Sequence, residues 1–363
     1  MKTFFFVFLF FCMGRAFGQR PSDSQRAPNL ILITADGLRW QEIFNGPDKI
    51  LSRECPQCLS GEETNLPGRE SLMPFVWNIF RHSGRLYGNR SLGNYVDTKN
   101  FHQFSYPGYT EMLCGEFNAL SASNKKSYNK QVSVLEVLNR HTSYRDRVAV
   151  FSSREVFPYI LNEPRSGIMV NAGWEEVKEG ILTPRLLNLN RGTLKAPRWK
   201  GETRFDDLTW QMAIEYTLAN HPKVLLISLD DTDRFGHQGD YCAYLEAIRQ
   251  FDRYLEQIWD LIQGDPFYKG NTYLLVSTDH GRGATPGTWN NHGFLPLRSG
   301  ETWYLEFGPG LEPGGEIKSR SMVRQESMAG RIAAYCGIPF KPHKNPFEMV
   351  LTPPEPVMAS NKP

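Results

Sequence analysis

NLILITAD, residues 29–36, is a short apolar run that ends in an aspartate, and it decides the fold that we expect. Similar apolar runs occupy residues 147–152, 224–229 and 273–277, and a further one occupies residues 302–307. Apolar runs of about four to eight residues between turn-forming residues are typical of strands buried on both faces of a sheet. Each run therefore predicts one buried strand.

Helical patterns lie between these runs. Residues 328–336 predict one helix, and residues 241–263 predict a longer one that ends at Gly264-Asp265-Pro266. In the longer pattern apolar side chains recur every three or four residues, at Leu245, Ile248, Phe251, Leu255, Ile258 and Ile262. Strands that alternate with helices predict an α/β fold, in which helices flank a mainly parallel central sheet.

Two stretches, residues 41–100 and 159–206, break this alternation. Both are expected to be loop-rich inserts that cover the site and select the substrate. We expect one catalytic domain at residues 29–350, a polar linker at residues 19–28 before it and a tail at residues 351–363 after it. The chain has no evident internal repeat or low-complexity tract.

The N-terminal residues predict the compartment. Lys2 precedes a short apolar core, and Ala16-Phe17-Gly18 forms a small-x-small cleavage site. This pattern is typical of a secretory signal peptide at residues 1–18, and an uncleaved membrane anchor is the alternative. We therefore expect a secreted or periplasmic protein. No later apolar run approaches about 20 residues, so we expect no membrane span after cleavage.

The overall charge and the cysteines exclude some partners and roles. The 363 residues carry a formal net charge of +2, which gives no basic footprint for nucleic acid. Cys55-Pro-Gln-Cys58 has no second CxxC beside it to complete a zinc site. In an oxidising compartment a local disulfide between these two cysteines is favoured over free thiols. The sequence does not indicate the oligomeric state.

Acidic residues and histidines follow three of the apolar runs, and one more histidine stands in the segment WNNHG. In α/β folds the site gathers at the carboxyl ends of the strands, so we expect these side chains to share one site. Carboxylates and imidazoles together suit two zinc-class cations. The candidate ligands are Asp36, Asp233, His237, Asp279, His280 and His292.

Each of these residues has another reading when it is taken alone. Asp36-Gly37 is a turn signal, and a lone His292 in a polar loop is usually a surface residue. Asp230, Asp231 and Asp233 could form a solvated acidic loop. However, acids this close repel one another unless a cation compensates them, which favours a metal nearby.

Ser105 begins the segment SYPGYTEMLCG and could supply a nucleophile. A serine at a helix N-terminus can direct its hydroxyl at a bound phosphate, and a metal would lower the pKa of that hydroxyl. The alternative is a structural serine that caps the helix.

In order along the chain, TADGLRW, SYPGYTEMLCG, DDTDRFGH, STDHGRG and WNNHG resemble motifs of the alkaline phosphatase superfamily. The similarity is greatest to the type I phosphodiesterase/nucleotide pyrophosphatase branch and to related secreted bacterial phosphatase-like proteins. It covers about residues 29–310 and implies an alkaline phosphatase-like sandwich.

The resemblance implies two Zn²⁺ ions, or similar divalent cations, and a small phosphate ester as substrate. It also implies that Ser105 attacks phosphorus and that the phosphoseryl intermediate is then hydrolysed. Whether the ester is a monoester or a diester stays open. One ion would be held by Asp233, His237 and His292, and the other by Asp36, Asp279, His280 and Ser105.

Two departures from the related patterns bear on the substrate. The diesterase branch usually has an asparagine three residues after its threonine nucleophile, where this chain has Gly108. Arg39, Tyr109 or Arg282 could contact the phosphate instead. Sulfatases carry an arginine where Tyr109 stands and paired aspartates where this chain has Ala35-Asp36, which counts against a sulfatase. A sulfatase-like enzyme, a phosphotransferase of this superfamily and a non-catalytic binding module remain the alternatives.

Overall fold

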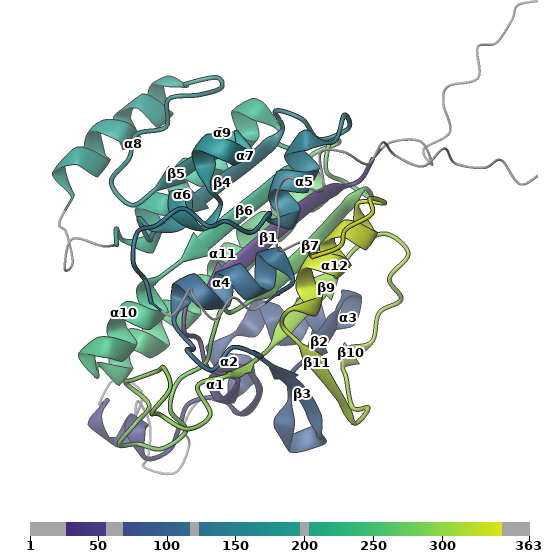
Figure 1. Cartoon of the computed structure of the whole chain (residues 1–363). Helices are drawn as coiled ribbons and strands as arrows, with labels where there is room; N and C mark the ends of the chain where they lie inside the picture. The colour runs from purple at the N-terminus through teal and green to yellow at the C-terminus, as the bar shows by residue number, and fades with distance from the viewer. Residues whose placement is uncertain (1–26, 56–67, 117–122, 197–202, 343–363) are drawn as a thin grey trace, which may run out of the picture.

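The computed structural model describes residues 27–55, 68–116, 123–196 and 203–342. Their elements form a large sheet with helices on both faces and a small second sheet (Figure 1). The expected signal peptide and C-terminal tail, together with Cys58, lie outside these residues. The expected α/β class is confirmed.

The large sheet has eight strands in the order β10-β2-β9-β7-β1-β6-β4-β5. The five strands from β7 to β5 are parallel, whereas β9 is antiparallel to β7 and to β2. The strands are β1 (Asn29–Ala35), β2 (Arg85–Tyr87), β4 (Val148–Ser152), β5 (Met169–Ala172), β6 (Val224–Leu229), β7 (Thr272–Ser277), β9 (Tyr304–Phe307) and β10 (Gly315–Glu316).

The second sheet joins three strands in the order β11 (Ser321–Arg324), β3 (Asn94–Asp97) and β8 (Glu301–Thr302). The predicted strand at residues 302–307 is therefore two strands that belong to different sheets. Between them lies Trp303, which is fully buried and donates its indole N–H to the carbonyl of Leu38 at 2.8 Å. The apolar run continues through this crossing, so the break is not visible in the sequence.

Helices cover both faces of the large sheet because the apolar strands carry buried side chains on each side. Ile31 and Ile33 of β1 belong to the core beneath α9 (Asp206–Asn220) and α11 (Tyr241–Gly264). Leu30 and Leu32 face the other core, which α4 (Ser105–Cys114), α5 (Val134–Arg140) and α12 (Ser327–Tyr335) cover. The central strand β1 is thus buried on both faces.

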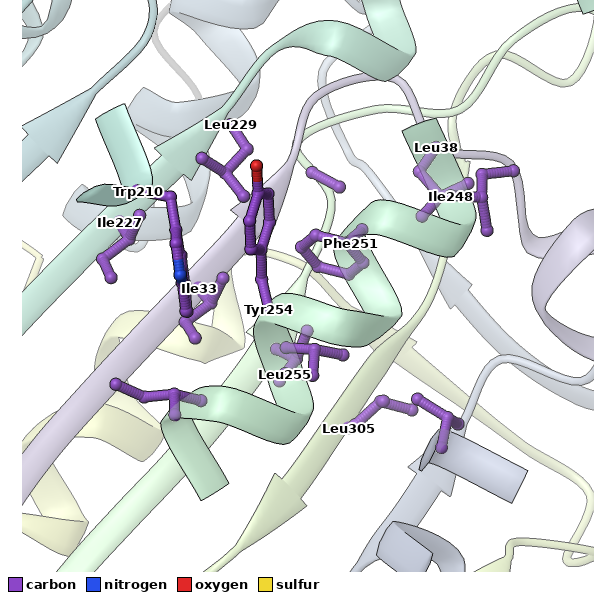
Figure 2. Close-up of a cluster of buried hydrophobic side chains, with 14 of the residues drawn as sticks. Ile33, Leu38, Trp210, Ile227, Leu229, Ile248, Phe251, Tyr254, Leu255 and Leu305 are labelled. Carbon is purple, nitrogen blue, oxygen red and sulfur yellow. The ribbon is translucent and has the colours of Figure 1, made fainter. Parts of the chain in front are cut away.

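Helix α11 confirms the longest helical pattern of the sequence. Asp240 caps its N-terminus by accepting a hydrogen bond from the backbone N–H of Ala243 at 2.9 Å. Figure 2 shows Ile248, Phe251 and Leu255 of this helix projecting into the core beneath the strands. Burial of each such side chain contributes about 1.5–3 kcal/mol to the stability of the fold. These contacts hold α11 against one face of the sheet.

The two predicted loop-rich inserts contain more regular structure than expected. Strand β2 in the first and β5 in the second pair with the large sheet. Strands of 3 and 4 residues, such as these two, give too little periodicity to be recognised in a sequence. The remaining elements are α1 (Trp40–Asn45), η2 (Leu51–Glu54), α2 (Arg69–Leu72), η4 (Val76–Phe80), α3 (Arg81–Ser83), η5 (Arg90–Leu92), α6 (Phe157–Ile160), α7 (Glu163–Ser166), α8 (Pro184–Lys195) and α10 (Asp231–Gln238).

The predicted Cys55–Cys58 disulfide is wrong. Cys55 instead forms a disulfide with Cys242, across a sequence separation of 187 residues. The reason is tertiary, because η2 packs against α11 and brings Cys55 to the first turn of that helix.

Within the described residues no helix is both long and apolar enough to cross a membrane.

Candidate active site

The predicted site residues gather at the carboxyl edge of the parallel strands. Asp36 follows β1, Asp233 lies on α10 after β6, and Asp279 and His280 follow β7. Because β1 lies between β6 and β7, the three acidic residues start from neighbouring strands. The backbone N–H of Asp36 continues the ladder by bonding the carbonyl of Leu229 at 2.8 Å.

One group of side chains surrounds Ser105, the first residue of α4. Its hydroxyl donates to Oδ1 of Asp36 at 3.4 Å. Nε2 of His280 lies 3.4 Å from the same carboxylate oxygen and 3.4 Å from Oδ2 of Asp279. All four side chains are buried. The helix-capping alternative for Ser105 is excluded, because Phe104 holds the N-cap position of α4.

A second group lies beside the first. Asp233 and His237 are four residues apart on α10, where they share one face of the helix. Asp233 lies 3.4 Å from Nε2 of His237 and 3.6 Å from Nε2 of His292. The rings of His280 and His292 stack with centroids 3.9 Å apart, which joins the two groups.

The hydrogen bonds of two histidines fix which ring nitrogen faces the carboxylates. Nδ1 of His280 lies 2.9 Å from the carbonyl of Gly281, and Nδ1 of His292 lies 2.7 Å from the carbonyl of Gln103. Since a carbonyl accepts, each Nδ1 carries the proton, and each Nε2 directs a lone pair towards the acidic groups. Metal-binding histidines are oriented in this way, with the second nitrogen donating to a carbonyl.

Several buried atoms of the site accept or donate no hydrogen bond. They are Oδ2 of Asp36, Oδ2 of Asp279 and Nε2 of His280. A lone pair that faces carboxylate oxygens is repulsive unless a cation lies among them. The donor set and the unpaired atoms thus fit divalent cations, and imidazole with carboxylate suits Zn²⁺.

The geometry groups the ligands slightly differently from the expectation. Ligand atoms of Asp233, His237 and His292 lie within 4.8 Å of one another, as do those of Asp36, Asp233 and His280. Asp233 therefore belongs to both sets. Asp279 stays beside the second set, where its Oδ1 accepts from the N–H of Gly37 at 3.1 Å and its Oδ2 faces His280.

The protonation preferences of the site follow from burial and crowding. Burial, and next the charge of Asp279, raises the pKa of Asp36 well above its usual range. Burial and the charge of Asp233 raise the pKa of Asp279 to about 7. Burial lowers the pKa of His280 to about 3, so this imidazole is neutral and ready to act as a ligand. Without a compensating cation the carboxylates resist ionising together.

Asp233 behaves in the opposite way. Burial opposes its ionisation, but Arg282, His292 and His237 hold the pKa of this carboxyl well below its usual range. Arg282 forms an ion pair with Oδ1 of Asp233 and donates to the carbonyls of Trp289 at 2.9 Å and Asn290 at 2.7 Å. This arginine thus holds Asp233 and the loop before His292 together.

Arg154, just after β4, is a site residue that the sequence reasoning missed. Its guanidinium lies 3.5 Å from Asp36, 2.6 Å from Asp230 and 2.8 Å from Asp233, and it is buried. The rule that identified the aspartates would have found it, because Arg154 also follows a predicted parallel strand. Metal-ligand chemistry does not indicate it, because a guanidinium has no lone pair to offer a cation.

The three residues expected to contact the phosphate have other partners. Arg39 is buried and ion-paired with Glu42. The hydroxyl of Tyr109 bonds Thr34 and Ser228, each at 3.0 Å, beneath the sheet edge. Arg39 and Tyr109 therefore stabilise the fold around the site, whereas Arg282 positions Asp233.

Gly108 is in close contact with the site backbone. A Cβ atom at this position would lie 2.6 Å from the carbonyl oxygen of Asp279, and Gln325 donates to the carbonyls of both residues at 3.2 and 2.8 Å. The asparagine of the related pattern therefore has no room here. Arg154 is linked to Ser105 through Asp36, whose carboxylate accepts from the serine at 3.4 Å and lies 3.5 Å from the guanidinium.

Comparisons with known proteins agree with this arrangement. Residues 202–293 match the Metalloenzyme superfamily. A 2,3-bisphosphoglycerate-independent phosphoglycerate mutase of Haloquadratum walsbyi is 33% identical over 79 residues, which are 22% of this chain and 15% of that protein. A phosphopentomutase of Aeromonas salmonicida is 26% identical over 175 residues, which are 47% of this chain and 38% of that protein. The chain thus spans well under two thirds of these curated relatives.

Solved structures share the fold at low identity. The lipoteichoic acid synthase LtaP of Listeria monocytogenes has a TM-score of 0.56 at 12% identity, over 87% of this chain and 73% of that one. The alkaline phosphatase PafA has a TM-score of 0.54 at 11% identity, over 86% of this chain and 96% of that one.

Phosphatases, sulfatases and phosphomutases all occur among these matches, and the phosphodiesterase branch stays a prediction. The matched segment and the shared fold make this chain similar to proteins of the alkaline phosphatase superfamily, and its gathered acidic and imidazole side chains are candidate metal ligands.

Proposed function

We propose that the chain is a metal-dependent hydrolase of phosphate esters in which Ser105 is the nucleophile. The observation that carries this proposal is the hydroxyl of Ser105, 3.4 Å from Asp36, beside buried acidic and imidazole atoms that lack hydrogen-bond partners. A hydroxyl among cation ligands suits phosphoryl transfer through a covalent intermediate.

Two divalent cations, Zn²⁺ by the donor chemistry, fit this chain. Asp233, His237 and His292 would hold one, and Asp36, Asp279, His280 and Ser105 would hold the other, with Asp233 also close to the second set. When bound, such ions polarise the phosphoryl oxygens and favour the ionised serine. These ligand assignments extend the prediction made from the sequence.

The protein residues have separate tasks in the proposed reaction. Oδ1 of Asp36 accepts the hydrogen bond of Ser105 and so orients its oxygen. A bond then forms between that oxygen and phosphorus, the ester P–O bond breaks, and the alcohol leaves with a proton. Water next attacks phosphorus, the bond to the serine breaks, and inorganic phosphate is released.

Arg154 is proposed to complement the charge of the phosphoryl group. It is buried, and its guanidinium lies 3.5 Å from the carboxylate of Asp36, which accepts from Ser105; it would supply the contact of the missing asparagine. Because Asp230 and Asp233 already bond Arg154, their carboxylates keep it in position when no substrate is bound.

Ser105→Ala tests the proposed nucleophile. With Zn²⁺ present, the variant should hydrolyse p-nitrophenyl phosphate on the order of a thousandfold more slowly than wild type. Its bound Zn²⁺, measured by elemental analysis, should stay near wild type, because the other ligands remain. Ser105→Thr keeps a hydroxyl and should recover part of the rate.

Ser133→Ala is the matched control, since Ser133 caps α5 by accepting from the N–H of Glu136 at 3.1 Å. It should lower stability by about 1 kcal/mol and leave turnover unchanged. Full activity of Ser105→Ala would overturn the proposed nucleophile. Bis-p-nitrophenyl phosphate and p-nitrophenyl sulfate in the same assay separate diesterase and sulfatase activity from monoesterase activity.

A phosphotransferase is the second candidate, and the curated relatives named as mutases favour it. Such an enzyme would pass the phosphoryl group from Ser105 to a hydroxyl of a sugar substrate instead of to water. With a pentose phosphate as substrate, it would produce an isomer without releasing inorganic phosphate. Measuring the isomeric pentose phosphate and the inorganic phosphate distinguishes a phosphotransferase from a hydrolase.

We also infer that the protein works in an exported, oxidising compartment, as the expected signal peptide implies. The disulfide between Cys55 and Cys242 supports this inference, because such bonds persist mainly outside the reducing cytosol. Fractionation of the native cells, with thiol labelling before and after reduction, tests it.

A further inference from the structure

We propose that the site acts on phosphate esters whose alcohol is apolar, and that a cluster of exposed apolar side chains beside His292 binds this alcohol. We call the cluster the apolar rim, and this inference rests on the hydrolase function proposed above. The apolar rim consists of Phe101, Phe294, Leu295 and Leu297.

The first observation is the exposure of these side chains. Leu295 is 85% exposed, Leu297 82% and Phe294 70%, which are the three highest values among the large apolar side chains in the described part of the chain. Phe101 is 50% exposed, and the centroid of its ring lies 6.4 Å from that of Phe294. Large apolar side chains that are exposed near one another on a folded protein indicate a surface that binds something apolar.

The second observation is where the apolar rim lies. Its two segments run side by side, because Nδ1 of His292 bonds the carbonyl of Gln103 at 2.7 Å and the ring of Phe104 contacts that of His292 at 5.6 Å. One segment leads directly into Ser105, and the other begins directly after His292. The apolar rim thus adjoins the candidate site through both of these residues.

The direction of phosphoryl transfer then relates the apolar rim to one part of the substrate. In an in-line displacement the alcohol leaves from the side of phosphorus opposite the nucleophile. Ser105 lies with Asp36 and His280, so the alcohol departs on the side of Asp233 and His292. The alcohol therefore emerges where the apolar rim begins.

Within the described residues, the charged side chain next to the apolar rim along the chain, Arg298, already has a partner. The four side chains of the apolar rim are uncharged, and the adjacent Arg298 is ion-paired with Glu301 at 2.7 Å. Contact with an alkyl or aryl group is therefore the interaction that this surface provides. Each buried methylene contributes about 0.8 kcal/mol, equivalent to a roughly fourfold gain in affinity.

A series of n-alkyl phosphates from ethyl to octyl tests the proposal, because chain length changes apolar area while the basicity of the leaving alcohol stays nearly constant. Below the micelle concentration, kcat/KM of wild type should rise at least about tenfold from ethyl to octyl phosphate. In a variant with Phe294→Ser, Leu295→Ser and Leu297→Ser, ethyl phosphate should be cleaved as in wild type, and the rise should disappear.

Binding gives a second measurement that does not depend on turnover. Octylphosphonate should bind wild type about tenfold more tightly than methylphosphonate in calorimetry, and the triple variant should bind both equally. A matched control replaces exposed apolar residues on and before α8, with Ile181→Ser and Leu194→Ser, at 62% and 60% exposure. This control should keep the chain-length dependence of wild type.

The outcomes separate this proposal from the one on which it rests. If wild type cleaves ethyl and octyl phosphate equally, the apolar rim does not bind the alcohol, but the hydrolase function stands. If wild type cleaves none of the esters, the hydrolase function itself fails. If chain length has no effect and phosphatidylcholine vesicles bind wild type but not the triple variant, the surface serves a membrane and the proposal is overturned.

Discussion

At the scale of single residues, Gly108 shows how tightly the site is built. Its position in the first turn of α4 brings the helix against the backbone of Asp279. This approach leaves no space for a side chain and places the hydroxyl of Ser105 near the ligands. Close packing therefore requires glycine at position 108, and this requirement explains why no asparagine stands there.

Replacement of Gly108 by alanine tests this requirement. The added Cβ would lie 2.6 Å from the carbonyl oxygen of Asp279, so the backbone at Asp279 must shift. We expect the variant to lose about 1–3 kcal/mol of unfolding free energy and to bind Zn²⁺ more weakly. Chemical denaturation and metal titration measure the two effects.

Gly330→Ala provides the control, because Gly330 lies in α12 and a Cβ there meets no atom within 4 Å. Helix propensity predicts that this variant gains up to about 1 kcal/mol. Equal stability gains in Gly108→Ala and Gly330→Ala would contradict the proposed contact.

The convergence of the acidic side chains was predictable from the sequence, whereas the arginine beside them was missed. Asp36 and Asp279 could be found because each follows an apolar run, and the carboxyl ends of parallel strands converge. Arg39 and Arg282 were chosen by proximity in the chain, and the structure assigns both to ion pairs. Arg154 follows the predicted strand at residues 147–152, so the same rule applies to it, but only the strand order shows that β4 lies beside β6.

At the scale of elements, α11 and η2 stabilise each other by packing together. Their contact forms the disulfide between Cys55 and Cys242, which closes a loop across 187 residues. Much of the large sheet lies within that loop. The bond therefore restricts the unfolded chain much more than a local Cys55–Cys58 bond would have done.

Cys242→Ser should destabilise the folded protein by about 2–4 kcal/mol, because the unfolded chain regains the freedom that the bond removes. Urea denaturation with and without reductant measures this loss. Cys336→Ala is the control: Cys336 is buried but not in a disulfide, so this variant should remain sensitive to reductant. A Cys242→Ser variant as stable as oxidised wild type would show that the cross-link contributes nothing.

Element prediction succeeded where burial gave a clear pattern. The predicted runs at residues 224–229 and 273–277 correspond to β6 and β7, and residues 241–263 correspond to α11. Short strands such as β2 and the edge strand β10 depend on tertiary pairing and have little pattern of their own. The disulfide partner was missed for a similar reason, because spacing in sequence says little about distance in space.

At the scale of the whole molecule, cation binding should be coupled to pH and to stability. In the ion-free protein the pKa of Asp279 is raised to about 7 by burial and by the charge of Asp233, so this carboxyl is protonated below that pH. A cation must displace the proton. Zn²⁺ affinity should therefore fall at least about tenfold per pH unit below about pH 7, where Asp279 is protonated.

His280 adds no such dependence near neutral pH, because burial lowers its pKa to about 3. Competition with a chromophoric chelator at about pH 6 and about pH 8 measures the affinity. Chelation should also lower the thermal midpoint of wild type, and by less at the lower pH, since ligand binding stabilises only the folded state. Asp279→Asn should bind Zn²⁺ more weakly and with a shallower pH dependence, and an unchanged slope would contradict the role given to Asp279.

The central position of β1 also bears on how the chain acquires its structure. The first strand in the sequence pairs with β6 and β7, whose residues Val224 and Tyr273 are made much later. During synthesis this apolar segment has no lasting partner until most of the chain has emerged. Folding must then close long loops before its main contacts form, which makes it slow and leaves the early segment prone to aggregation. The nascent protein should therefore need protection of residues 29–35 until β7 is complete.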